Sequence, residues 1–259
     1  MKESNKFMLL VFLTFSISIF YYIELFRNIK LWLYDIRNCF NDMYFFSFLI
    51  DHMHIITYIF LFLLFSILLV NGIIKNSIYL SNIIRFYWRL KKQIHKNKNS
   101  ILINTKKPTA FNIFNKIFLS KSLMKNLTFS ELKIVLLHEK IHKQNKDFYK
   151  MLFINLTLNF LPDLISSRLK NKFSLLIEHE VDKKVIEKVN PEIYASVLLK
   201  TYKINLDVPQ INSYVKTRVE SILYEKDIFI KYKYFIYSIL ALVSLSYITH
   251  ILRICFCGM

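Results

Sequence analysis

Residues 128–150 read TFSELKIVLLHEKIHKQNKDFYK, and this stretch decides how the rest of the chain is interpreted. Thr128 is followed three residues later by Glu131, which makes a capping box, so the pattern predicts that a helix begins here. On that helix His138 and His142 are four residues apart, which puts both imidazoles on one face. Two imidazoles on one face can bind a single metal ion. The stretch therefore predicts a metal site carried by a helix.

Glu139 follows the first histidine and can accept a proton from a water activated by that metal. A catalytic zinc also needs a third protein ligand and leaves its fourth position to water. The downstream segment 176–185 has helical character and supplies Glu178 as the preferred third ligand. His179 and Glu180 are the competing candidates.

Further side chains have predicted supporting roles. Asp182 is four residues after Glu178, so on a helix it shares that face and can orient a ligand imidazole. Tyr194 and Arg218 are the available donors for a developing oxyanion, with packing or a salt bridge as the structural alternative for each. Two histidines and one glutamate favour one Zn²⁺ per chain, with another divalent metal as the alternative.

Composition favours a mainly α-helical membrane protein. Of 259 residues 54% are hydrophobic, and only two glycines and four prolines are available for turns. The net charge is +18, and nine Lys or Arg with no acidic residue fall within residues 75–107. Because this segment directly follows an apolar run, we expect cytoplasmic topology and contact with anionic lipid, and no nucleic-acid partner. The three cysteines, Cys39, Cys255 and Cys257, form neither a disulfide framework nor a zinc-thiolate site.

Three apolar runs have the length of membrane spans, Phe7–Ile23, Ile55–Ile74 and Tyr234–Leu252. Residues 24–54 carry three basic and four acidic side chains, fewer positive charges than the segment after the second span. The positive-inside rule then places residues 24–54 outside and residues 75–233 in the cytoplasm, in a multi-pass protein of the cell membrane.

Two further apolar segments are too short to span. Residues Tyr44–Ile50 are expected to lie along the outer membrane surface or to form a short re-entrant segment. Residues Met151–Leu161 are expected to form a helix that leans on or partly enters the membrane. An extended helix over 148–165 that spans the membrane is the alternative.

From about residue 100 to 225 the chain resembles the BlaR/MecR-type membrane metallopeptidases, which are antirepressor gluzincins. The matching pieces are Ala110-Phe111, Ile117 to Ser120 with Leu123, Leu127-Thr128, Glu131-Leu132, the HExxH residues with Asp147 five positions on, Pro162, Glu178, Asp182, Tyr194-Ala195, Leu198-Leu199 and Arg218. The HtpX/Ste-type membrane proteases are a close second resemblance, which implies the same chemistry on other substrates. The chain has Val181 directly before Asp182, where relatives usually have a small residue or cysteine, which is a mild departure. Only seven residues follow Leu252, so we expect no penicillin-binding sensor domain and no antibiotic sensing.

The resemblance implies zinc at His138, His142 and Glu178, Glu139 as general base, Asp182 as a supporting residue and a structural role for Asp147. It implies a zincin-like (gluzincin) domain with a small β-sheet inside a helical membrane protein. The expected domains are residues 1–74 with two spans and an external loop, residues 75–233 with the cytoplasmic peptidase, and residues 234–259 with a last span and tail.

The predicted function is zinc-dependent hydrolysis of a protein or peptide at the cytoplasmic membrane face. A regulator such as a repressor, or the chain itself, is the expected substrate. An extended substrate would pair with an edge strand formed by Ile101–Asn104 or by Thr109–Asn112. The alternatives are an inactive membrane scaffold of the same fold and a basic protein that binds lipid or nucleic acid through residues 75–107.

Overall fold

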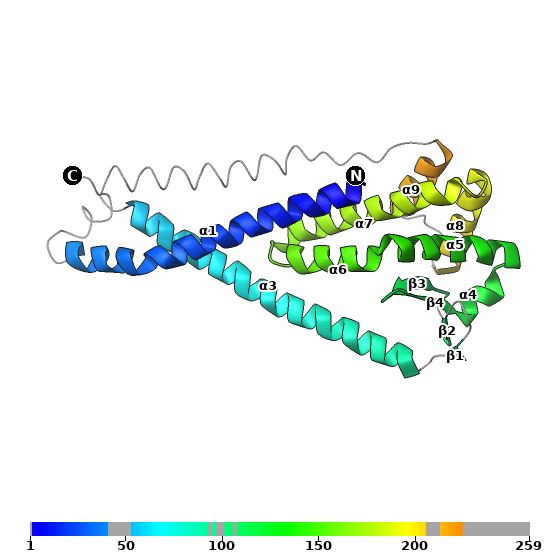
Figure 1. Cartoon of the computed structure of the whole chain (residues 1–259), viewed down its shortest axis with the longest axis horizontal. Coiled ribbons are helices and arrows are strands. Elements are labelled where there is room, and N and C mark those ends of the chain that lie inside the picture. Colours follow the sequence, from blue (N-terminus) through cyan, green and yellow to red (C-terminus); the bar gives the residue numbers. More distant parts are fainter. Residues whose placement is uncertain are drawn as a thin grey trace.

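The computed structural model describes residues 2–40, 53–92, 95–96, 101–105, 108–205 and 213–224. Two long helices, α1 (Glu3–Phe40) and α3 (Met53–Lys92), make an elongated part, and the other elements gather toward one end of it (Figure 1). The described chain is mainly helical with one small sheet, as predicted. The expected span Tyr234–Leu252, the segment Tyr44–Ile50, Cys255 and Cys257 lie outside the described residues.

Helices α1 and α3 contain the first two expected spans but are longer than those spans. α1 continues past Ile23 to Phe40, and α3 continues past Ile74 to Lys92, so the basic segment begins as helix where a loop was expected. Within them, Glu3–Glu24 and Phe62–Lys91 are long and apolar enough to cross a membrane, by length and composition alone. Only 12% and 6% of their most apolar windows are buried, so most of these side chains face outward.

The short apolar segment after the HExxH helix forms half of a helical hairpin. Helix α6 (Asp147–Leu158) ends before Pro162, and α7 (Asp163–Ile186) runs back along it, so the alternative of one continuous helix over 148–165 is wrong. The hairpin packs against the start of α1. Their shared core consists of Phe7, Val11, Ile154, Leu158, Phe173, Leu176 and Ile177. The first turns of α1 are thus part of the domain core.

Polar side chains join the hairpin to α3. Asn155 donates to the hydroxyl of Tyr79 at 3.1 Å, and Asn159 donates to the side chain of Asn76 at 2.7 Å. Asn76 in turn donates to the backbone carbonyl of Leu156 at 3.0 Å. These bonds explain the two asparagines in an otherwise apolar segment, because each has a partner on the neighbouring helix.

Gly72 lies where α3 passes close to the turn of the hairpin. A Cβ atom there would overlap the ring of Phe160, which also packs on Phe15 of α1 at 5.1 Å between centroids. We expect Gly72→Ala to lower the free energy of unfolding by about 1–3 kcal/mol, the usual cost of overpacking. Urea unfolding in detergent, followed by circular dichroism, measures this. The double variant Gly72→Ala/Phe160→Leu should recover part of the loss; no recovery would contradict the assigned contact.

The sheet has four strands, β1 (His95–Lys96), β2 (Ile101–Ile103), β3 (Ala110–Ile113) and β4 (Lys116–Ser120), in the order β1-β2-β4-β3. β2 lies between β1 and β4, so the edge-strand expectation for Ile101–Asn104 is wrong and that for Thr109–Asn112 is met by β3. One face of the sheet, with Phe111 and Phe118, packs with Leu90 of α3. The other face, with Ala110 and Leu119, packs on the helices that follow.

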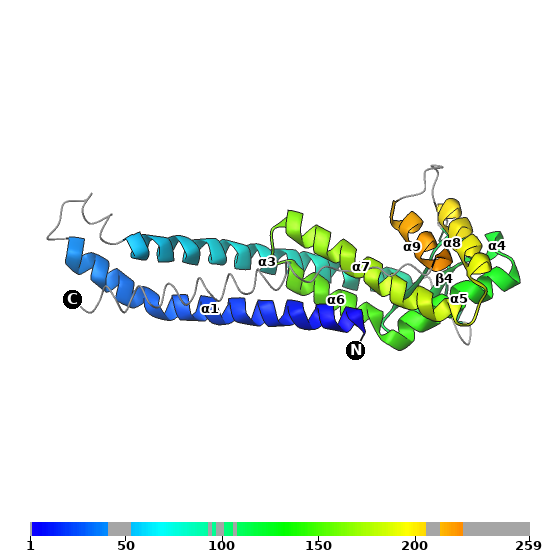
Figure 2. The ribbon, with the colours of Figure 1, turned by 90° about the horizontal axis from the view of Figure 1, so that it is seen from above.

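The helices on this face are α4 (Lys121–Asn126) and α5 (Phe129–Asn145). Two further helices, α8 (Pro191–Asn205) and α9 (Ser213–Leu223), pack on α5 and α7. The predicted capping box is confirmed: Thr128 accepts from the backbone of Glu131, whose side chain accepts from the backbone of Thr128. α5 contacts β3 and β4 on one side and α7 on the other. The HExxH helix therefore lies between the sheet and the helix that carries Glu178 (Figures 1 and 2).

Candidate metal centre

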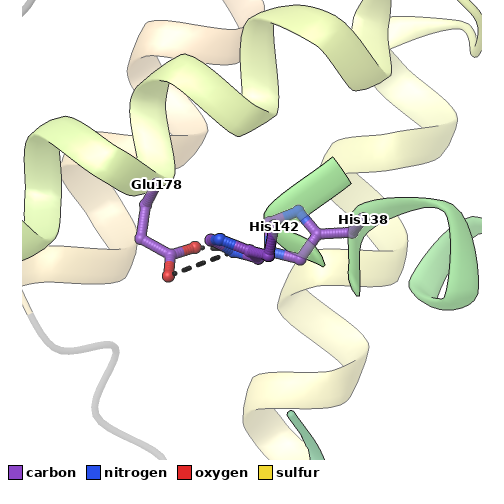
Figure 3. A group of neighbouring side chains, drawn as sticks. All are labelled: His138, His142 and Glu178. Atoms are coloured by element: carbon purple, nitrogen blue, oxygen red, sulfur yellow. Dashed lines mark hydrogen bonds and ion pairs between the residues drawn. The ribbon is translucent and has the colours of Figure 1, made fainter. Parts of the chain in front are cut away.

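His138 and His142 on α5 face Glu178 on α7 across the contact between the two helices (Figure 3). Nε2 of His138 lies 3.0 Å from Nε2 of His142 and 3.3 Å from Oε2 of Glu178. Nε2 of His142 lies 3.5 Å from Oε1 of Glu178. In the part of the chain that the structure describes, these three residues are the group of His, Cys, Asp and Glu side chains able to hold a metal.

The spacing of these atoms fits a tetrahedral zinc ion. Zinc binds imidazole nitrogen and carboxylate oxygen at about 2.0–2.2 Å, so two ligands at the tetrahedral angle lie about 3.3 Å apart. The two histidine nitrogens are 3.0 Å apart, and the nearest Glu178 oxygen to each lies at 3.3 Å (Oε2) and 3.5 Å (Oε1), all close to this value. His138 and His142 are one helical turn apart, and no backbone change is needed to bring them to the same ion. The residues present therefore fit the metal that the motif implies.

The outward nitrogen of His138 is held by Tyr194. The Tyr194 hydroxyl donates to Oδ1 of Asp182 at 2.5 Å and lies 2.8 Å from Nδ1 of His138. Because the hydroxyl proton goes to Asp182, the oxygen accepts from Nδ1–H of His138, and this leaves Nε2 as a lone-pair donor for a metal. Burial and the charge of Asp182 raise the pKa of Tyr194 well above its ordinary value, so the phenol stays protonated.

Asp147 orients the second histidine. Its Oδ2 lies 2.9 Å from Nδ1 of His142, and its side chain is buried. Burial by itself lowers the pKa of His142, but the hydrogen bonds to Asp147 and Glu178 outweigh it and raise that pKa to about 10. The family resemblance implies only a structural role for Asp147, whereas the structure places it against a candidate ligand. Its position depends on the left-handed backbone of Lys146, with φ 57°, which ends α5 and starts α6.

Arg218 on α9 joins the two carboxylates of α7. Its Nε and Nη2 donate to the two oxygens of Asp182 at 2.9 and 2.7 Å, and its Nη1 lies 3.0 Å from Oε2 of Glu178. Burial alone would raise the pKa of Glu178, but Arg218 and the two histidines hold it well below its ordinary range. Glu178 is therefore ionised and ready to bind a cation.

The predicted general base lies beside the ligands. Glu139 is 8% exposed, and burial raises its pKa above the ordinary value although His138 and His142 act in the opposite direction. A raised pKa makes a carboxylate a stronger base near neutral pH. Glu139 and His138 also line a cavity of about 160 Å³ that reaches Ala110 at the start of β3.

The competing residues of α7 point elsewhere. His179 is buried, with Nδ1 3.4 Å from the hydroxyl of Ser221 on α9. Glu180 accepts from the backbone and the side chain of Ser4 at 2.7 and 2.8 Å. Of the three candidates for the third ligand, only Glu178 lies within the described metal-capable group. The oxyanion role suggested for Tyr194 and Arg218 stays a prediction. In the structure Tyr194 is bonded to Asp182 and His138, and Arg218 is bonded to Asp182 and Glu178.

Comparison with known proteins gives a family match over the segment that carries the site. The family model of peptidase family M48 matches residues 79–189, which include both ligand helices. Over this segment the chain is similar to M48 metallopeptidases, and the match does not separate the BlaR/MecR type from the HtpX/Ste type. None of the curated proteins matches the chain.

Proposed function

We propose that this chain, related over residues 79–189 to M48 metallopeptidases, is a zinc-dependent endopeptidase that cleaves protein substrates at the cytoplasmic face of the cell membrane. The observation that carries the proposal is the meeting of the Nε2 atoms of His138 and His142, 3.0 Å apart, with the carboxylate of Glu178, whose two oxygens lie 3.3 and 3.5 Å from them. Glu139 follows His138 on the same helix. A structural zinc site has four protein ligands, whereas a catalytic site has three and leaves room for water.

Different residues of the chain have different roles in the proposed peptide hydrolysis. A zinc ion bound there supplies Lewis-acid polarisation of the substrate carbonyl and makes a water more acidic. Glu139 takes the proton of the attacking water and passes it to the leaving amine. Tyr194 and Asp147 hold the outer nitrogens of the two histidines, which keeps their inner nitrogens aimed at one point. Arg218 keeps Glu178 ionised.

β3 and the cavity supply a place for an extended peptide. β3 is an edge of the sheet beside α5, so its outer backbone can pair with a substrate strand. The cavity of about 160 Å³ is close to the roughly 150 Å³ that accommodates a benzene ring in another protein interior. Apolar side chains make up most of its wall, namely Leu123, Ile134, Val135, Val197 and Leu198. We therefore expect a substrate with a large apolar residue next to the cleaved bond.

The outward-facing apolar helices favour a membrane protein. Large side chains on α1 and α3 are more than half exposed, including Phe20 at 71%, Ile67 at 65% and Phe60 at 63%. So many large exposed apolar side chains are unusual in water and are suited to lipid. The basic residues within 75–107 would then meet anionic headgroups on the cytoplasmic side. A substrate at that surface is a membrane protein, a regulator such as a repressor, or the chain itself.

The test is metal content together with proteolysis. Detergent-purified wild type should hold about one zinc per chain, and His142→Ala should hold none. His179→Gln is the matched control, because it removes an imidazole outside the donor group and should retain the zinc. Cleavage of co-expressed membrane and cytoplasmic proteins, followed by mass spectrometry of new termini, should appear only with the zinc-binding proteins. Wild type that binds no zinc, or equal cleavage by His142→Ala, would refute the proposal.

A further inference from the structure

The first turn of α1 is bonded to the helix that supplies the third ligand. Ser4 is fully buried, and Glu180 accepts both its backbone N–H, at 2.7 Å, and its hydroxyl, at 2.8 Å. Glu180 lies two residues beyond Glu178 on α7. A carboxylate that accepts from a helix amino end also interacts favourably with the helix dipole. Figure 2 shows the amino end of α1 against this part of the domain.

The contact continues to the second ligand histidine. Nζ of Lys150 lies 3.3 Å from the hydroxyl of Ser4 and 3.3 Å from Oδ1 of Asp147. The other oxygen of Asp147 lies 2.9 Å from Nδ1 of His142. A continuous series of polar contacts therefore runs from Glu180 through Ser4, Lys150 and Asp147 to His142.

A second series of polar contacts starts at Lys2, just before α1. Nζ of Lys2 donates to Oδ1 of Asn145 at 2.6 Å, and Lys184 of α7 donates to the same oxygen at 2.8 Å. The amide nitrogen of Asn145 lies 3.5 Å from Oδ2 of Asp147. Two routes from the start of α1 thus reach the carboxylate that orients His142.

Packing holds this turn of α1 in place. Phe7 stacks on Phe173 of α7 with 5.2 Å between ring centroids, and Val11 is buried in the same core. Beyond these residues α1 continues as the outward-facing apolar stretch up to Glu24. One continuous helix therefore connects the surroundings of the metal centre to the segment suited to lipid.

We infer that the amino-terminal turn of α1 is a positioning element of the metal centre, so that displacing α1 from α7 weakens metal binding. This inference rests on the proposed zinc site. It makes Ser4, Glu180 and Lys150 positioning residues, which act on His142 and Glu178 without touching the metal. The physical basis is that groups behind metal ligands hold them in orientation, and losing such groups typically lowers metal affinity about 10–100-fold. A force on the membrane part of α1 would change zinc affinity by the same route.

The test measures zinc affinity by competition with a chromogenic chelator in detergent-purified full-length protein. Ser4→Leu places a large side chain at a fully buried position and should push α1 off α7. We expect its dissociation constant for zinc to rise about tenfold or more. Ser16→Leu makes the same substitution at an exposed position of α1 and should bind zinc like wild type. Glu180→Gln removes only the charge that holds Ser4 and should weaken binding in the same direction, in case Ser4→Leu fails to fold.

A second readout uses the reciprocity of coupled sites. If α1 affects zinc affinity, zinc must stabilise the first turn of α1, so zinc should slow hydrogen exchange at the amides of residues 4–7 in wild type. In Glu180→Gln this protection should be reduced. Wild type without zinc affinity would refute the proposed function itself. Wild type that binds zinc, with Ser4→Leu and Glu180→Gln equally tight and no change in exchange, would overturn the inference alone.

Discussion

Replacing Glu139 by glutamine is expected to lower kcat/KM for peptide hydrolysis about 10²–10⁴-fold while one zinc per chain is retained. Glu139 is not among the three metal donors, and an amide of the same shape cannot accept the proton of the attacking water. The side chain is 8% exposed, so solvent has little access to replace it as base. The loss should appear in kcat more than in KM, because the proton moves only during the reaction.

The measurement is hydrolysis of a fluorogenic peptide library by detergent-purified, zinc-loaded protein, with zinc content determined on the same sample. Glu187→Gln is the matched control, since it changes an exposed carboxylate at the end of α7 and should leave the rate unchanged. If Glu139→Gln hydrolyses peptides at the wild-type rate, another group is the base. If it loses zinc as well, Glu139 supports the metal rather than the proton transfer.

Replacing Arg218 by methionine is expected to lower the stability of the metal-free protein by about 3–5 kcal/mol. The guanidinium is buried and contacts Asp182 through two nitrogens and Glu178 through the third. Its removal leaves Asp182 without its cation and leaves Glu178 with only the two histidines beside it, and an unpaired buried charge is costly. Arg218→Lys keeps one charge but cannot reach both carboxylates with the same geometry, so its loss should be smaller.

Urea unfolding in detergent, with and without zinc, measures this difference. Zinc should restore part of the stability of Arg218→Met, because the ion places a positive charge beside Glu178. It should not restore all of it, because zinc does not replace the hydrogen bonds that Arg218 donates to Asp182. A variant as stable as wild type without zinc would contradict the proposed charge pairing. Full rescue by zinc would show that the contact with Asp182 contributes little.

Local features of the sequence determined the start of the site helix and the pair of histidines on it. The capping box acts within one turn, and the spacing of His138 and His142 follows from helical geometry alone, so neither depends on distant residues. Composition similarly determined that the chain is mainly helical with two long apolar helices.

The sequence preferred Glu178 as third ligand but left His179 and Glu180 as competitors, and the tertiary structure distinguishes the three. Glu178, His179 and Glu180 are adjacent in sequence, and only the packing of α7 on α5 points Glu178 toward the histidines while Glu180 turns to Ser4. Arg218 pairs with α7 because α9 packs there.

The contacts of Asp147 and of the start of α1 were likewise not predictable from the sequence. Asp147 reaches His142 because Lys146 adopts a left-handed backbone between the two helices. Glycine is the residue that usually takes this conformation, so a lysine there gives no sign of it in the sequence. The first turn of α1 reads as the start of an apolar span, yet in the fold it packs between α6 and α7 behind the metal ligands. Helix starts and ligand spacing depend on contacts within a few residues, which sequence displays directly. The partners of those ligands depend on how helices far apart in the chain pack together, and no local pattern encodes that packing.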